Sequence, residues 1–424
     1  PPAPEAGEGG IVLLADDPRA ALARLAARFH AAQPETVVAV TGTNGKTSVA
    51  EFTRQIWTAL GARAASLGTI GLRAPAGVER AVPGLTTLDP VALHALLADL
   101  AGAGIGRLAI EASSHGLDQH RLDGVRLAAA GFTNLTRDHL DYHGTMEAYR
   151  DAKLRLFTEC LDPGGTAVIN AAGAGAPAFL EAVRRRGLAC LTVGGPGTDI
   201  ALLSLRTHAR GLGIDIGHAG RMRALDLPLY GGFQAYNALV AAGLALATGG
   251  EADAVFGALQ QLAGAPGRMD KVAEGPGGAP VFVDYAHTPD ALETVLKALR
   301  PHVTGRLHVV FGAGGDRDRG KRPLMGAAAK AFADAVIVTD DNPRGEEPAS
   351  IRAAILAACP GAREIGDRAE AIEAALAGLG RGDVLVIAGK GHESGQIVGE
   401  RTLPFSDAQT ARAAAARARG EAHG

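Results

Sequence analysis

Apolar and polar positions follow one another along this chain in blocks that predict strands and then helices. Residues 36–40 are apolar and β-branched, which is typical of a buried parallel strand. Residues 48–60 have apolar side chains at helical spacing, namely Val49, Phe52, Ile56 and Leu60. The same patterns predict strands at 108–110, 127–132 and 166–170 and helices at 90–100 and 146–157. This alternation predicts a mostly parallel sheet with helices on both faces.

The segments on either side of this block have patterns of their own. Before it, residues 11–14 predict a short strand, and residues 18–30 predict an amphipathic helix with Leu22, Leu25 and Phe29 on one side. After it, residues 200–226 alternate less regularly and predict a small antiparallel segment, which a helix at 234–247 follows. The glycines and proline of residues 263–267 predict a hinge.

A second α/β block follows the hinge. Its predicted strands are 281–284, 307–311, 335–339 and 384–387, and its predicted helices are 291–299, 324–332 and 351–358. Ligand-binding groups in open parallel sheets collect beyond the carboxyl ends of the strands. We therefore expect four polar segments to share one edge of this sheet: 284–287, 312–319, 340–344 and 389–393.

Size and composition narrow the classes of protein. The 424 residues predict two or three domains. Lys and Arg number 42 against 45 Asp and Glu, and aromatic residues make up 4%, so we expect no nucleic-acid partner. Cys160, Cys190 and Cys359 lack metal-binding spacing and suit free thiols in a reducing compartment. No apolar run has membrane-spanning length, so we expect a cytoplasmic protein without membrane insertion.

Residues 41–47 have the chemistry of a triphosphate cradle. Glycines between a strand and a helix let backbone N–H groups approach phosphate oxygens, and the helix N-terminus and Lys46 add positive charge. The hydroxyl of Thr47 suits the magnesium ion that accompanies the nucleotide. The usual pattern has glycine at position 40, where this chain has Val40, and the turn uses Gly42 instead. The segment predicts binding of ATP and Mg²⁺.

Polar motifs follow two predicted strands at the same edge. Glu111 opens residues 111–115, and residues 134–143 include His139 and His143, so a Glu and a His there could hold magnesium beside the γ-phosphate. The two histidines also have the i, i+4 spacing of a zinc pair, which leaves a zinc hydrolase as an alternative that does not explain the phosphate loop. On the residues alone, Lys153 is expected to be a solvated lysine.

Arginine-rich loops mark the second block. Residues 312–322 do not meet dinucleotide-loop spacing, and they suit an anion-binding loop because a guanidinium group binds carboxylates bidentately. Residues 340–344 offer another arginine with acidic neighbours. Such a mixed set suits a zwitterionic amino acid, and solvated surface loops remain the alternative.

Five of these motifs, at 41–47, 111–120, 134–143, 284–289 and 389–393, occur in an order that resembles the Mur ligases of bacterial cell-wall synthesis. The resemblance extends from about residue 11 to the end and is strongest to the branch that adds a diamino acid to the peptide stem. It implies an ATP-dependent acid–amino-acid ligase of peptidoglycan synthesis, and hence a role in cell shape and division. ATP would phosphorylate the glutamyl carboxylate of UDP-N-acetylmuramoyl-L-alanyl-D-glutamate, and the amine would attack the acyl phosphate.

The resemblance also implies a domain plan. Residues 1–35 would be a remnant of an amino-terminal UDP-binding domain that is largely absent, so we expect weakened binding of the UDP substrate. Residues 36–268 would be the central P-loop ATPase domain, and residues 269–424 the carboxy-terminal Rossmann-like domain that binds the amino acid. We expect a monomer.

The family's functional residues transfer to matching positions of this chain. Those implied for catalysis are Lys46, Glu111, His139 and Lys153. Those implied for ATP are Gly42, Thr43, Asn44, Gly45, Lys46, Thr47, Asn237, Arg268 and Asp284. Those implied for the UDP substrate are Thr86, Thr87, Ser113, Gln119 and Arg121. Those implied for the diamino acid are Arg317, Asn342, Arg344, Gly389 and Glu393. The implied magnesium ligands are Thr47, Glu111, His139 and a carbamylated Lys153. Two positions depart from the family pattern: Gln234 replaces an asparagine, and Leu88 replaces a proline.

Alternatives remain at this stage. Residues 341–344 resemble the meso-diaminopimelate type, in which Arg344 would bind the distal carboxylate, while L-lysine and L-ornithine stay possible acceptors. A folylpolyglutamate-type ligase shares the phosphate loop, but the motifs at 341–344 and 389–393 argue against it. A nucleotide-binding module without catalysis would have no need for Lys46, Glu111, His139 and Lys153 together.

Overall fold

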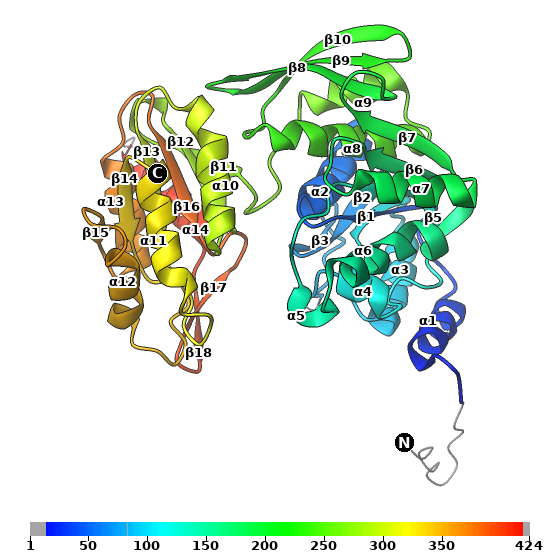
Figure 1. Cartoon of the computed structure of the whole chain (residues 1–424), viewed down its shortest axis with the longest axis horizontal. Helices are drawn as coiled ribbons and strands as arrows, with labels where there is room; N and C mark the ends of the chain where they lie inside the picture. Colours follow the sequence, from blue (N-terminus) through cyan, green and yellow to red (C-terminus); the bar gives the residue numbers. More distant parts are fainter. Residues whose placement is uncertain (1–13, 83, 419–424) are drawn as a thin grey trace. The chain divides into compact units, whose positions relative to one another are not determined.

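The computed structural model describes residues 14–82 and 84–418, which form two compact units (Figure 1). The first unit comprises the chain up to residue 203 with 216–223 and 236–259, and the second comprises 204–215, 224–235 and everything from 260. The predicted strand at 11–14 lies almost wholly outside the described residues. Within the described ranges, no helix is long and apolar enough to cross a membrane.

The first unit is built on a mostly parallel sheet, as predicted. Its strand order is β10-β9-β8-β7-β6-β5-β1-β4-β2-β3, and β1 pairs in parallel with both β4 and β5. The strands are β1 (Thr36–Thr41), β2 (Ala64–Gly68), β3 (Gly71–Arg73), β4 (Arg107–Glu111), β5 (Leu127–Phe132), β6 (Leu161–Asn170), β7 (Ala189–Gly194), β8 (Ile200–His208), β9 (Gly211–His218) and β10 (Arg221–Leu227). The last three strands have residues in both units.

Helices cover both faces of this sheet. They are α1 (Pro18–Phe29), α2 (Lys46–Ala59), α3 (Pro90–Gly102), α4 (Ser114–Asp118), α5 (Leu140–His143), α6 (Met146–Arg155), α7 (Ala176–Arg186), α8 (Phe233–Ala247) and α9 (Ala252–Leu259). The predicted helix 146–157 ends as an α-helix at Arg155 and continues as a π-helical turn, Leu156–Cys160. Val49, Phe52 and Ile56 of α2 are fully buried, as the helical spacing predicted, whereas Leu60 of the same predicted stripe follows the end of α2 and is 36% exposed.

Helix α1 turns a different face inward than its pattern suggests. Leu22, Leu25 and Phe29 do lie on one side, but they are 48%, 50% and 83% exposed, while Ala20, Ala23 and Ala26 are buried. Short alanine side chains let α1 approach α3 closely, so the helix packs through its small residues.

The second unit has three layers. Its sheet has the order β11-β12-β16-β13-β14-β15, parallel except for β11. The strands are β11 (Asp270–Glu274), β12 (Pro280–Asp284), β13 (Leu307–Phe311), β14 (Ala335–Val338), β15 (Arg363–Glu364) and β16 (Val384–Ala388). One face carries α10 (Pro289–Leu299), α11 (Lys321–Phe332) and α12 (Pro348–Leu356), and the other carries α13 (Arg368–Ala377) and α14 (Asp407–Ala418) (Figure 1). Short 3₁₀ turns, Pro276–Gly278 and Arg300–His302, and a hairpin of β17 (Gly395–Val398) and β18 (Arg401–Pro404) complete it.

Candidate active site

The predicted phosphate loop lies between β1 and α2. Strand β1 continues through Val40, which pairs with Glu111 of β4, so the chain turns only after Thr41 and position 40 needs no glycine. Gly45 begins the turn into α2 with a φ of 88°. A Cβ atom on Gly45 would lie 2.4 Å from Oδ1 of Asn237 on α8. The structure therefore brings Asn237, which is predicted to bind ATP, against the loop, and only glycine fits between them.

Two lysines converge on this loop. The Nζ atom of Lys46 donates to the backbone oxygens of Gly42 and Thr43 at 2.9 and 2.8 Å. The Nζ atom of Lys153, at the end of α6, donates to the same Gly42 oxygen at 2.9 Å. Tyr149 fixes this part of α6, because its hydroxyl lies 3.1 Å from Oγ1 of Thr43 and its ring lies 4.5 Å from the Lys153 Nζ atom.

Lys153 is not the solvated lysine that its polar helix suggests, since it is only 1% exposed. Burial, with a smaller effect from the positive charge of Lys46, lowers the pKa of Lys153 from 10.5 to about 6. The side chain is therefore held neutral at neutral pH. A neutral amine is a nucleophile, which an ordinary ammonium group is not.

Glu111 stands on the strand beside β1 and is 2% exposed. Its carboxylate accepts hydrogen bonds from the backbone N–H and the hydroxyl of Thr69 at 2.8 and 3.1 Å. Thr47, in the first turn of α2, is also buried. Hard oxygen ligands of this kind suit Mg²⁺, which takes one or two carboxylates with substrate phosphates and water.

His139 lies in a cluster of aromatic rings near the loop. It precedes α5 with a φ of 52°, and its side chain is 46% exposed. Its ring lies 4.9 Å from the ring of His115 and 6.2 Å from that of Tyr149, while His115 and His143 lie 5.5 Å apart. Burial lowers the pKa of both His115 and His143. In the part of the chain that the structure describes, no three His, Cys, Asp or Glu residues form a metal-binding group, so the zinc interpretation gains no support.

The five residues predicted for the UDP substrate lie together beside Glu111. The hydroxyl of Thr87 donates to the Glu111 backbone oxygen at 2.9 Å and lies 3.1 Å from Oγ of Ser113. Arg121 donates to the backbone oxygen of Thr87 at 2.6 Å and to Oε1 of Gln119 at 2.7 Å. Thr86 joins them indirectly, because its hydroxyl lies 3.0 Å from that of Thr69, which also binds Glu111.

Three residues of this cluster were not predicted from the sequence: Thr69, Asp118 and Tyr142. The Gln119 amide nitrogen donates to the hydroxyl of Tyr142 at 3.0 Å, and that hydroxyl donates to Asp118 at 2.8 Å. Asp118 and Tyr142 lie inside the motifs at 111–120 and 134–143, so their proximity in sequence to Gln119 and His139 could have identified them. Thr69 lies outside every motif and gave no indication. The departure at Leu88 is accommodated because this side chain is buried in the core.

Arg268 and Asp284 adjoin each other in the second unit. The carboxylate of Asp284 accepts hydrogen bonds from the backbone N–H groups of Met269 and Ala286 at 2.7 and 2.9 Å. Burial raises the pKa of Asp284, and the positive charge of Arg268 opposes this shift. The guanidinium group of Arg268 lies 4.5 Å over the ring of Tyr285. Gln234 is buried, and its backbone N–H donates to Gly231 at 2.9 Å.

The residues predicted for the diamino acid lie at the carboxyl edge of the second sheet. The amide nitrogen of Asn342 donates to Oε2 of Glu393 at 3.0 Å. Arg344, with a φ of 51°, donates to the backbone oxygen of Gly315 at 3.0 Å. Gly389 has a φ of 120°, and a Cβ atom there would lie 2.4 Å from a carboxylate oxygen of Asp341, so it serves the packing of this edge. Arg317 is exposed, and its guanidinium group donates to the backbone oxygen of Asp316 at 3.4 Å.

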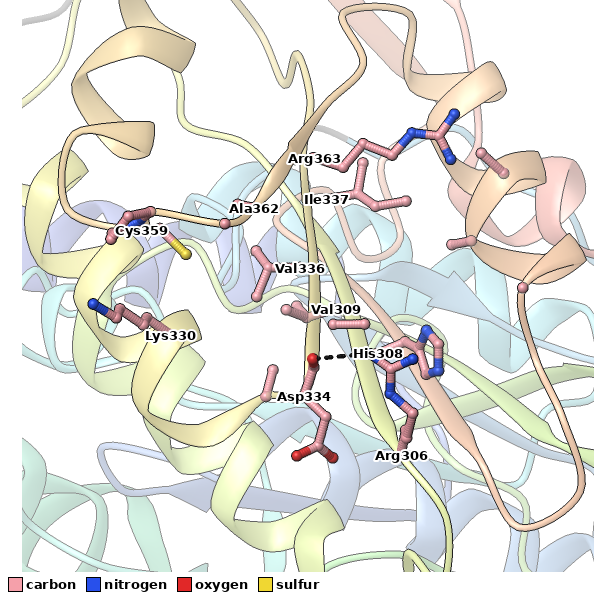
Figure 2. A pocket seen from close by; sticks show the side chains of 17 residues that line it. Arg306, His308, Val309, Lys330, Asp334, Val336, Ile337, Cys359, Ala362 and Arg363 are labelled. Carbon is pink, nitrogen blue, oxygen red and sulfur yellow. Dashed lines mark hydrogen bonds between the residues drawn. The ribbon is translucent and has the colours of Figure 1, made fainter.

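A hollow of about 390 Å³ lies at the opposite edge of this sheet, where β13 and β14 begin (Figure 2). Its floor is apolar, and its walls carry Arg306, His308, Lys330 and Arg363. The side chain of Arg306 is tied to the backbone oxygen of Asp334 at 3.2 Å. The residues that line this hollow include none of those predicted from the sequence motifs.

Comparison with known proteins bears on both units. The family model described as the Mur ligase middle domain matches residues 40–245, and the one described as the Mur ligase glutamate ligase domain matches residues 267–391. A relative from Bradyrhizobium diazoefficiens is 57% identical over 405 residues, covering 94% of this chain and 83% of its own. A relative from Caulobacter vibrioides is 55% identical over 412 residues, covering 96% of this chain and 85% of its own. Both are named UDP-N-acetylmuramoyl-L-alanyl-D-glutamate--2,6-diaminopimelate ligase.

Solved structures agree with these relatives. A structure of a ligase with that same name has a TM-score of 0.72 and 36% identity, and the match covers 98% of this chain and 86% of that one. Folylpolyglutamate synthase from Mycobacterium tuberculosis, complexed with ADP, has a TM-score of 0.67 but only 21% identity, covering 88% of this chain and 91% of that one. The second likeness shows a shared fold alone.

Proposed function

The chain belongs to the Mur ligase family, and from that membership we propose that it is an ATP-dependent ligase that joins 2,6-diaminopimelate to UDP-N-acetylmuramoyl-L-alanyl-D-glutamate. The observation that carries the proposal is 57% identity to a ligase of this name across 94% of the chain. Lysine- and ornithine-adding ligases are less well supported, since the relatives are named for 2,6-diaminopimelate. A folylpolyglutamate-type ligase is less well supported because its likeness to this chain, at 21% identity, is one of fold alone. We propose that the enzyme acts in peptidoglycan synthesis, that it is cytoplasmic, and that it is a monomer.

The chemistry divides into two steps. A glutamyl carboxylate oxygen attacks the γ-phosphorus of ATP, so an acyl phosphate forms and ADP leaves. The amine nitrogen of the acceptor then attacks the acyl carbon, inorganic phosphate leaves, and the nitrogen loses a proton. Positive charge must be positioned around the phosphoryl group in the first step, because negative charge spreads over its oxygens.

Residues of the first unit have the chemistry for this step. Lys46 and the N–H groups of residues 42–45 would hold the β- and γ-phosphates. Thr47, Glu111 and His139 would hold Mg²⁺, which neutralises phosphate charge when bound. The Thr87, Ser113, Gln119 and Arg121 cluster adjoins Glu111 and would orient the UDP substrate.

We assign Lys153 a carbamylated state in the working enzyme. The neutral Lys153 nitrogen attacks the carbon of CO₂, a proton leaves, and a carbamate anion forms. The modification would turn a neutral amine beside Lys46 into an anion with oxygen ligands for a second magnesium ion. The buried amine that hydrogen bonds to Gly42 supports this assignment, because its low pKa leaves the nitrogen lone pair available.

The test is phosphate release from ATP with the UDP-dipeptide substrate and each of meso-diaminopimelate, lysine and ornithine. We expect release that depends on both substrates and is fastest with diaminopimelate. Equal or faster release with lysine would reassign the acceptor. A lack of release with every acceptor, in protein that binds ATP, would favour a non-catalytic nucleotide-binding module.

A further inference from the structure

Lys390 is a fully buried lysine in the middle of the residues predicted to bind the diamino acid. Its side chain is 0% exposed. Its Nζ atom donates to Oδ1 of Asn342 at 2.8 Å and to Oε2 of Glu393 at 3.1 Å, and it lies 4.0 Å from Oδ1 of Asp341. Burying an ammonium group is costly unless hydrogen bonds and charges compensate it, and here all three partners belong to the predicted acceptor site or adjoin it.

Asn342 has little hydrogen-bonding capacity left for a ligand. Its Oδ1 atom accepts from Lys390 and also from the backbone N–H of Ile397, at 2.9 Å, which uses both lone pairs. One of its two N–H groups donates to Oε2 of Glu393. A single N–H group remains, so the amide oxygen of Asn342 is structural.

Glu393, unlike Asn342, keeps one side-chain oxygen available for a ligand. Its Oε2 atom accepts from both Lys390 and Asn342, while Oε1 accepts no hydrogen bond from residues 14–82 and 84–418. The side chain is 33% exposed, in contrast to the buried lysine. Lys390 and Asn342 therefore fix one carboxylate oxygen and leave the other facing outward, where an ammonium group of the substrate can bind.

Asn342 also ties the β17–β18 hairpin to this cluster. Besides the Ile397 bond, the Gln396 amide nitrogen donates to the backbone oxygen of Asp341 at 2.7 Å, and the Arg344 N–H donates to the oxygen of Ile397 at 3.1 Å. Loss of the Lys390 charge would thus disturb Asn342, Glu393 and the hairpin together.

We propose that Lys390 is a positioning residue that acts through Asn342 and Glu393, orienting the Glu393 carboxylate toward the amino group of the diamino acid. This inference rests on the proposed function for the identity of the ligand. The arrangement of the three side chains stands independently of it.

The test is the change Lys390→Met, with Lys330→Met as the control because it removes the same charge from an exposed position of the same unit. We expect the KM for diaminopimelate to rise at least tenfold in Lys390→Met, while the KM values for ATP and the UDP substrate change less than twofold. Lys330→Met should match the wild type. An unchanged KM for diaminopimelate, or an equal rise of all three values, would overturn the proposal.

A double-mutant cycle separates positioning from general damage. If Lys390 acts through Glu393, the double variant Lys390→Met, Glu393→Gln should have about the KM of Glu393→Gln alone. If the increases in KM from the two single changes instead multiply in the double variant, the coupling is refuted. If Lys390→Met does not fold, the same cycle with Lys390→Gln in its place tests the coupling, since glutamine removes the charge and keeps a polar side chain beside Asn342 and Glu393.

Hydrogen exchange gives a reading that does not depend on the substrate. Peptides covering residues 389–398 should exchange at least tenfold faster in Lys390→Met or Asn342→Ala than in Lys330→Met. Unchanged exchange would refute the structural link. By contrast, absence of diaminopimelate-dependent turnover in the wild type would refute the proposed function, whatever the exchange rates.

Discussion

The protonation state of Lys153 makes a quantitative prediction, because the perturbation is simply pH. With a pKa of about 6, close to 97% of this amine is neutral at about pH 7.5, against roughly 0.1% for an ordinary lysine. The folded-state pKa lies below the unfolded value of 10.5, so the unfolded chain binds the extra proton between these two values. Stability therefore rises with pH across this window, by about 1.4 kcal/mol per pH unit.

The assay is urea unfolding of the wild type and Lys153→Met in buffer without magnesium, nucleotide or bicarbonate. Trp57 is the single tryptophan of the chain and is buried in α2, so its fluorescence reports the unfolding of the first unit. Between about pH 7 and pH 9, the unfolding free energy of the wild type should increase by roughly 2.7 kcal/mol relative to that of Lys153→Met. Lys271→Met, which removes an exposed lysine of the second unit and keeps Lys153, should show the same increase as the wild type.

The same amine should take up CO₂. With ¹³C-labelled bicarbonate, a carbamate resonance should be present at about pH 8, should weaken as pH falls toward 6, and should be missing in Lys153→Met. Two results would refute the reasoning. The first is a stability difference between wild type and variant that does not depend on pH. The second is an amine that titrates near 10.5, which would mean that burial does not determine its charge.

Three further changes test other parts of the site. Gly45→Ala should raise the KM for ATP at least tenfold, because its Cβ would meet Asn237, whereas Gly61→Ala, with a similar φ of 84° but open space around it, should leave this KM unchanged. Glu111→Gln should lower kcat by about a hundredfold or more and raise the Mg²⁺ concentration needed for half-maximal rate, measured as phosphate release. Arg344→Gln should raise the KM for diaminopimelate by tenfold or more and leave that for lysine unchanged, since lysine lacks the distal carboxylate; equal effects on both would contradict this role.

The periodic elements could be predicted from the sequence because their patterns follow from burial. Strand β1 is apolar from Val37 to Val40 because both faces of the sheet are covered, and α2 shows a buried stripe at helical spacing. Parallel pairing then determines which edge receives the polar segments. For this reason residues 340–344 and 389–393, which are far apart in sequence, could be placed together from the sequence alone.

Elements whose environment depends on distant partners could not be predicted in this way. The apolar stripe of α1 gives the correct helix, but Leu22, Leu25 and Phe29 are exposed because its alanines make the contact with α3. Lys390 is similar. Its neighbours in sequence are glycines, and only the fold surrounds it with Asn342 and Glu393.

The two lysines of the phosphate loop illustrate why tertiary contact decides chemistry. Lys46 and Lys153 are far apart in sequence, yet both Nζ atoms hydrogen bond to the oxygen of Gly42 at 2.9 Å. Burial is the main reason why Lys153, at 1% exposure, gives up its proton, and the positive charge of Lys46 at the same carbonyl adds a smaller effect. Lys46 is less deeply buried than Lys153. Because the charge of Lys46 lowers the pKa of Lys153, replacing Lys46 should raise that pKa.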